Sequence, residues 1–95
     1  MYTHHFFRTF SLFHKALGNE RRVYILFLLW KYGPMTGVQL VERFGIHSAA
    51  VSRHLHLLLN AGLILGQRKK MVVYFSINPT PEIIRLMKVI EKLTF

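Results

Sequence analysis

The sequence predicts a mainly helical domain with one small β-hairpin near its C-terminal end. Apolar residues recur at helical spacing through most of the chain, and glycine or proline interrupts that spacing at short intervals. After Gly62 a run rich in β-branched and aromatic residues, Met71 to Ile77, is typical of a strand. Because 95 residues hold only one domain's worth of chain, we expect a single domain over residues 1–95.

Two helices are predicted before the first proline. The apolar stripe of the first helix, over about residues 3–17, consists of Phe6, Phe10, Phe13 and Leu17, widened by Phe7. Gly18 ends this helix, and Asn19 is a natural N-cap for the next one. The second helix, about Glu20 to Tyr32, is apolar nearly all round, so we expect it to be the most buried helix. Gly33 and Pro34 end it.

Two shorter helices follow, joined by a tight turn at Gly45. Thr36 can cap the first, and the second begins at His47 or Ser48 and ends near Ala61. Two short helices joined through a glycine-containing turn are the helix-turn-helix arrangement.

A hairpin and a last helix complete the predicted fold. Residues 63–65 lead into a polar and basic tip, and the strand over 71–77 returns. Lys69-Lys70 is a poor two-residue turn, because positive φ favours Gly or Asn, so we expect a tip looser than a tight turn. Thr80 and Pro81 then start a helix over 81–94. The order α-α-α-α-β-β-α is that of a winged helix-turn-helix.

Composition narrows the function. Thirteen Lys and Arg oppose four Glu and no Asp, for a formal net charge of +9, which favours nucleic acid over a membrane surface as the partner. The absence of cysteine excludes a disulfide scaffold, a thiolate metal site and a Cys nucleophile. The longest apolar run, Val23 to Trp30, has eight residues, far fewer than the roughly 20 that span a bilayer. With no visible targeting segment, we expect a soluble cytoplasmic protein with no membrane partner.

The fourth predicted helix has one side suited to the core and one suited to double-stranded DNA. Its core side consists of Val51, Leu55, Leu58 and Leu59. The opposite side carries small and polar residues, and an arginine there can donate two hydrogen bonds to O6 and N7 of guanine. We assign to DNA contacts from this helix Ser48, Ala49, Ser52, Arg53 and His56. The alternative is an ordinary solvated helix face.

The hairpin tip carries Gln67, Arg68, Lys69 and Lys70. This basic tip is either a solvated turn that keeps the sheet edge from aggregating or a wing that binds phosphates or the minor groove. Because the recognition-helix pattern precedes it at the right distance, we favour the wing and assign all four residues to DNA contacts.

The chain has more apolar residues than a domain of its size can easily bury. Of its residues 52% are hydrophobic, and eight are Phe. Pairing of the two terminal helices, about residues 3–17 and 81–94, with a second copy would cover the surplus and demand a pseudo-palindromic operator. The residues assigned to this homodimer interface are Phe6, Phe7, Phe10, Ile83, Ile84, Met87 and Ile90.

Four segments resemble the ArsR-type family of transcriptional repressors. Residues 13–22 are similar to the family's opening motif "F-K-A-L-G-[DN]-x-x-R", and residues 45–55 to its recognition motif "G-L-S-Q-x-x-V-S-R-H-L". Residues 61–64 resemble "A-G-L-V", and residues 73–79 resemble the wing return "V-Y-Y-x-L-N-P". The resemblance implies a prokaryotic or archaeal winged-helix repressor, dimeric through its first and last helices. A chromosome, a plasmid or a virus can encode it.

The chain departs from the metal-sensing members of that family. Residues 35–40 lack their Cys ligands, and residues 81–95 contain neither Asp nor His. His4 and His5 are more often a surface pair than a site, and we interpret His54 as a packing residue. We therefore predict no metal site and no cofactor. His47 stands where the family commonly has a capping Ser, and Ser48 can take over that cap.

An enzyme is not expected, because four scattered Glu without Asp or Cys assemble no nucleophile, base and orienting group. The leading hypothesis is a sequence-specific dimeric repressor. The alternatives are a winged-helix module that binds another protein and a nonspecific architectural DNA binder. A strong dependence of binding on DNA sequence separates the first hypothesis from both alternatives.

Overall fold

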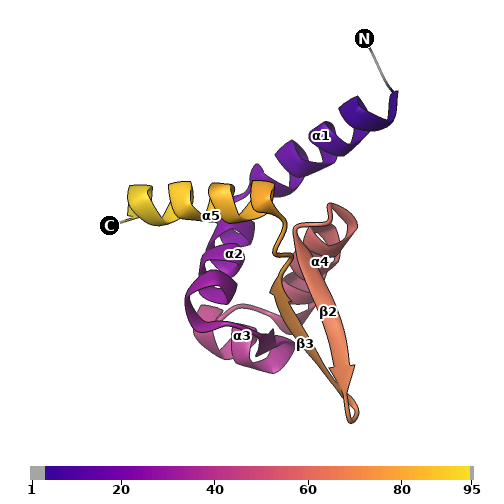
Figure 1. The fold of residues 1–95 in the computed structure, drawn as a ribbon. Coiled ribbons are helices and arrows are strands. Elements are labelled where there is room, and N and C mark those ends of the chain that lie inside the picture. The colour runs from indigo at the N-terminus through magenta and orange to yellow at the C-terminus, as the bar shows by residue number, and fades with distance from the viewer. Residues whose placement is uncertain (1–3, 95) are drawn as a thin grey trace.

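The computed structural model describes residues 4–94, with side chains described for residues 7–93. It confirms the predicted mainly helical fold with a C-terminal hairpin (Figure 1). The elements in chain order are α1 (His4–Leu17), α2 (Glu20–Tyr32), β1 (Met35–Thr36), α3 (Gly37–Phe44), α4 (Ser48–Asn60), β2 (Ile64–Lys69), β3 (Val72–Ile77) and α5 (Pro81–Thr94).

Side-chain caps fix the starts of three helices. The Asn19 side chain accepts a hydrogen bond of 2.9 Å from the backbone N–H of Arg21 at the start of α2. Thr36 and Gln39 form a reciprocal capping box at the start of α3, with distances of 2.9 and 3.1 Å. The Thr80 hydroxyl accepts from the first turn of α5 at 3.3 Å. All three caps lie where the sequence predicted a helix start.

The turn between α3 and α4 depends on Gly45. Its φ of 66° lies in the left-handed region, and its N–H donates to the carbonyl of Val41 at 2.9 Å. A side chain at this position would strain the backbone, so glycine sets the sharp change of direction between the two helices.

The sheet has three antiparallel strands in the order β1-β3-β2. β2 and β3 pair from Ile64 opposite Ile77 to Lys69 opposite Val72. The sequence did not predict β1, whose Met35 lies opposite Phe75. A strand of two residues has no alternating pattern of its own and forms only because β3 offers it a hydrogen-bonding edge.

The tip of the hairpin is a tight two-residue turn. Lys70 and Met71 occupy it with φ values of 52° and 41°, and pairing continues up to Lys69 and Val72. Our expectation of a looser tip is therefore wrong. Two positive φ values match the twist of the paired strands, which favours this turn even though neither residue is Gly or Asn.

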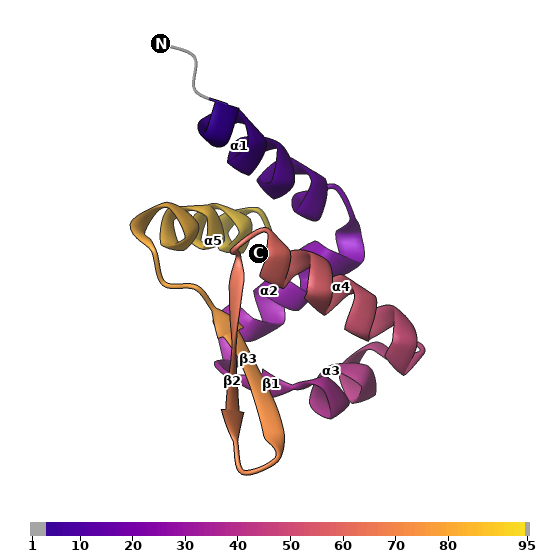
Figure 2. The same ribbon diagram turned by 90° about the vertical axis from the view of Figure 1, so that its right-hand side faces the viewer.

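The core lies around α2, the helix predicted to be most buried. Ile25 and Leu26 of α2 are fully buried, as are Leu40 of α3, Leu58 of α4 and Met87 of α5. α2, α3, α4 and α5 thus each contribute an apolar side chain to one cluster. The N-terminal half of α1, in contrast, extends away from the other elements in both ribbon views (Figures 1 and 2).

The structure corrects part of the predicted dimer interface. Ile83 and Met87 expose 2% and 0% of their surface within the single chain, so they pack against its own core and cannot contact a second copy. Ile84 and Ile90 are half-buried. The side chain of Phe6 lies outside the described residues.

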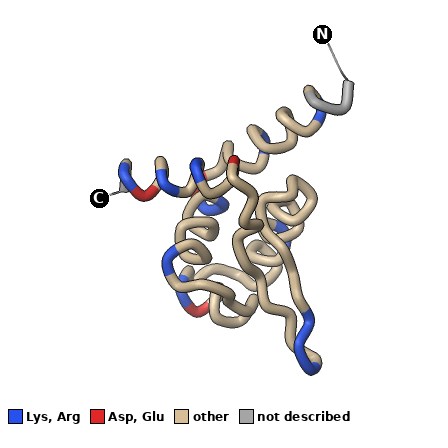
Figure 3. The backbone as a smooth tube through the Cα atoms, viewed as in Figure 1, with Lys and Arg blue, Asp and Glu red and all other residues tan. Residues whose placement is uncertain are grey.

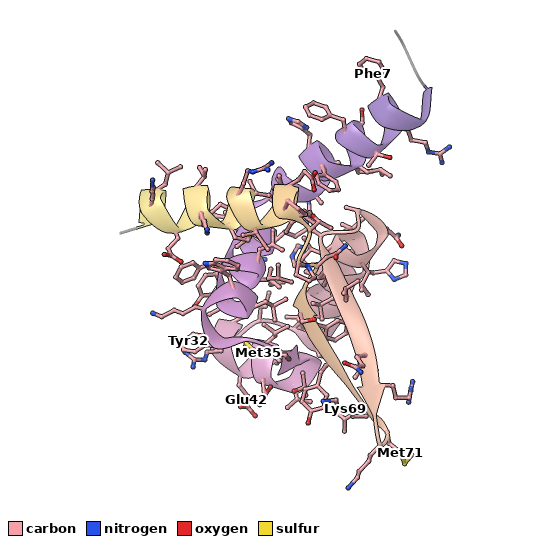
Figure 4. All side chains as sticks on the ribbon, in the orientation of Figure 1. Phe7, Tyr32, Met35, Glu42, Lys69 and Met71 are labelled. Carbon is pink, nitrogen blue, oxygen red and sulfur yellow. The ribbon has the colours of Figure 1, made fainter. Side chains whose placement is uncertain are left out.

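Two α1 residues of the predicted interface remain at the surface. Phe7 and Phe10 expose 45% and 53% of their side chains, and Phe7 lies toward the outer end of α1 (Figure 4). Val89 and Leu93 on α5 are also exposed.

Candidate nucleic-acid interface

The fourth helix has the two-sided character that its sequence predicts. Val51, Leu55 and Leu58 expose at most 4% of their surface and hold α4 against the core. Every residue assigned to DNA contacts on this helix is exposed, namely Ser48, Ala49, Ser52, Arg53 and His56. The structure thus places these five on the surface of α4 away from the core, with no acidic residue in the helix.

The start of α4 differs from the starts of α2 and α3. The helix begins at Ser48, and His47 occupies the N-cap position without a side-chain capping bond. The His47 carbonyl accepts from Ala50 and Val51 at 3.0 and 3.1 Å. Neither His47 nor Ser48 provides a side-chain cap, so N–H groups in the first turn of α4 have no side-chain acceptor. Such groups, at the positive end of the helix dipole, favour an anion such as a phosphate.

The basic hairpin tip lies at the far end of β2 and β3. Gln67, Arg68, Lys69 and Lys70 are all exposed, and the basic residues form one continuous stretch of the backbone at the end of the hairpin (Figure 3). Side chains alternate between the two faces of a strand, so Arg68 points to the opposite face from Gln67 and Lys69. The tip projects beyond the helices (Figures 1 and 4), a shape that allows contact with a partner surface lying along α4.

His54 lies on the inner side of α4, not on its exposed face. It is 6% exposed, and its Nδ1 lies 3.4 Å from the Arg22 guanidinium of α2. Burial, reinforced by the positive charges of Arg22, Arg53 and Arg21, lowers the pKa of His54. The neutral ring is thus favoured, and our interpretation of His54 as a packing residue is confirmed.

Sequence reasoning missed the partner of His54. Arg22 donates to the carbonyls of Ala16 and Lys15 at the end of α1, at 2.7 and 3.1 Å. Arg22 is the second arginine of the Arg21-Arg22 pair, and the pattern alone does not distinguish a half-buried, hydrogen-bonded arginine from an exposed one.

Other site types find little support in the described part of the chain. Among the described side chains, those of residues 7–93, no three His, Cys, Asp or Glu gather where they could hold a metal ion. The His4 and His5 side chains fall outside the described set. Across the same residues, no helix combines the length and apolar character that a membrane crossing requires.

Comparisons of sequence identify related proteins. The profile of the bacterial regulatory proteins of the arsR family matches residues 19–65, the segment from the start of α2 into β2. The transcriptional repressor SdpR of Bacillus subtilis is 39% identical over 66 residues, which cover 70% of this chain and 72% of SdpR.

Comparisons of structure extend the similarity to nearly the whole chain. HlyU from Vibrio cholerae has a TM-score of 0.82 at 23% identity, over 96% of this chain and 97% of HlyU, and shows the same fold. The homodimeric winged helix-turn-helix DNA-binding domain Mb0332 from Mycobacterium bovis, described as a possible ArsR-family transcriptional regulator, also has a TM-score of 0.82. It is 25% identical, and the match covers 94% of this chain and 81% of that domain.

Proposed function

This chain belongs to the arsR family of bacterial regulatory proteins, and from that premise we propose that it is a dimeric repressor that binds a pseudo-palindromic operator. The observation that carries the proposal is the exposed face of α4, where small and polar residues surround one arginine beside a basic hairpin.

In this proposal α4 enters the major groove and distinguishes bases. Arg53 can bind the O6 and N7 acceptors of guanine, and Ser52 and His56 lie on the same exposed face. Ala49 lets the helix backbone approach the base edges closely. Ser48 begins the helix, where uncapped N–H groups suit a phosphate of the same half-site.

The hairpin contributes affinity rather than sequence discrimination. Arg68, Lys69 and Lys70 are exposed cations at the tip, with Gln67 beside them. Lysine and arginine that neutralise phosphates release counterions whatever the sequence. We therefore propose that the hairpin is the wing, which binds phosphates next to the half-site or enters the minor groove.

Two such recognition helices require a second copy of the chain. Phe7 and Phe10 are about half exposed on the part of α1 that extends from the other elements, and Ile84 and Ile90 are half-buried on α5. We propose that these terminal helices pair across a two-fold axis. The homodimeric state of the similar Mb0332 domain supports this arrangement. We also infer that the protein acts without catalysis, in the cytoplasm, where its DNA lies.

Selection of binding sites from random DNA tests the proposal. The chain should enrich two inverted half-sites whose centres lie about one helical turn, roughly 10 base pairs, apart. Sedimentation without DNA should give a species of twice the 11.2 kDa chain mass. Binding without sequence enrichment would show a nonspecific architectural protein, and no DNA binding would favour a protein-interaction module. Either result would overturn the proposal.

A further inference from the structure

Arg22 lies where three helices meet. Its Nε donates to the Ala16 carbonyl at 2.7 Å, and one terminal nitrogen donates to the Lys15 carbonyl at 3.1 Å. The other terminal nitrogen lies 3.4 Å from Nδ1 of His54. One side chain of α2 therefore connects the end of α1 to the recognition helix.

The chemistry of this contact favours an Nδ1 of His54 that carries no proton. A guanidinium has N–H donors and no acceptor, so Nδ1 accepts from Arg22 only while it carries no proton. Protonation would turn the contact into two donors and two positive charges face to face. The charged groups that act on His54 are Arg22 and Arg21 of α2 and Arg53 of α4, and all of them disfavour the imidazolium. From α1 the site receives backbone carbonyls, while the ammonium-bearing Lys15 side chain is exposed.

The position of α1 depends on its attachment at this junction, because its N-terminal half extends away from the other elements (Figure 2). Its 14 residues make a helix about 21 Å long. A tilt on the order of 10° at the junction would move its far end by roughly 4 Å. A shift of that size is large compared with the tolerance of a hydrogen bond to a base edge.

We propose that Arg22 is a positioning residue for DNA binding. By donating hydrogen bonds to neutral His54 on α4 and to the end of α1, it fixes the angle between α1, the helix of the dimer contact, and α4, the recognition helix. This inference rests on the proposed function. In the dimer that angle sets the separation of the two recognition helices, and hence whether both half-sites of one operator are bound together. Neither Arg22 nor His54 needs to touch DNA.

Arg22→Ala tests the proposal, with Arg21→Ala as the matched control. Both variants lose one positive charge from the first turn of α2, but Arg21 is exposed. Affinity is measured for the operator selected by the wild-type chain and for a duplex carrying one half-site. Arg22→Ala should lose at least about tenfold on the full operator and change less than about threefold on the half-site. Arg21→Ala should match the wild type on both. Equal losses on both DNAs would mean a structural role only and would overturn the proposal.

The pH dependence of operator affinity in the wild type provides a second test, and it needs no substitution that could disturb the fold. If operator binding needs neutral His54, affinity should fall as the pH drops through the pKa of His54, which lies below its ordinary value, by up to about tenfold per protomer for each further pH unit. Binding to random DNA should show no such loss, because it does not require the two recognition helices to lie at a fixed separation.

His54→Asn should remove the acid loss on the operator, because an amide oxygen can replace Nδ1 as the acceptor and does not titrate. An operator affinity that stays constant or rises on acidification of the wild type would overturn the proposal. These outcomes differ from a failure of the proposed function. In that case the wild type would select no operator at all, and the inference would fall with it.

Discussion

Replacing Lys69 and Lys70 with alanine should weaken DNA binding and reduce the dependence of the affinity on salt concentration. Both side chains are exposed at the hairpin tip, so a dimer loses four cations. If each contacts a phosphate, the slope of log affinity against log salt should become shallower by about 0.9 per contact, or about 3.6 for the dimer. Between about 50 and 200 mM salt, the wild type should then lose on the order of a hundredfold more affinity than the variant.

Fluorescence anisotropy with labelled operator and random duplexes, at several salt concentrations, measures this slope. Both DNAs should respond alike, because counterion release carries no sequence information. The matched control is Arg85→Ala with Lys92→Ala, which removes the same charge from exposed positions on α5, at the opposite end of the molecule from the tip (Figure 1). If the wing variant keeps the wild-type slope, or if the α5 control changes it equally, the hairpin is a solvated turn.

Four further results are expected. Arg53→Ala should cost about 1–3 kcal/mol on the operator and much less on random DNA, and an unchanged ratio in anisotropy titrations would mean that α4 does not distinguish bases. Met71→Gly should raise the free energy of unfolding by roughly 0.5–1 kcal/mol in urea titrations, because glycine removes the backbone strain of a positive φ at this exposed residue. Met71→Ala should give no gain, because alanine keeps that strain. Phe10→Lys should raise the dimer dissociation constant by roughly a hundredfold or more in sedimentation while circular dichroism stays helical; a wild-type dimer constant would place the interface elsewhere. Burial lowers the pKa of His54, so below about pH 6.5 the unfolded chain binds more protons than the folded chain. The free energy of unfolding should therefore fall from pH 7.5 to pH 5.5, and it should fall less in His54→Asn.

The sequence alone determined the local structure and the class of partner. Capping residues such as Asn19 and Thr36 act within a few residues of themselves, so the helix starts could be predicted from neighbouring positions. The 3.6-residue period of α4 likewise separated its core side from its polar side, as the exposure of Arg53 bears out. Net charge needs no structure at all, and it indicated a polyanionic partner.

Only the tertiary structure decided what each apolar or polar face packs against. A periodic stripe shows that residues share a face, but not whether that face packs on its own chain or on a second copy. For this reason Ile83 and Met87 were assigned to an interface although they lie in the core. β1 depends in the same way on a strand about 40 residues away in the sequence, since Met35 pairs with Phe75. The contact between Arg22 and His54, 32 positions apart, exists only because three helices converge, and no local pattern encodes that convergence.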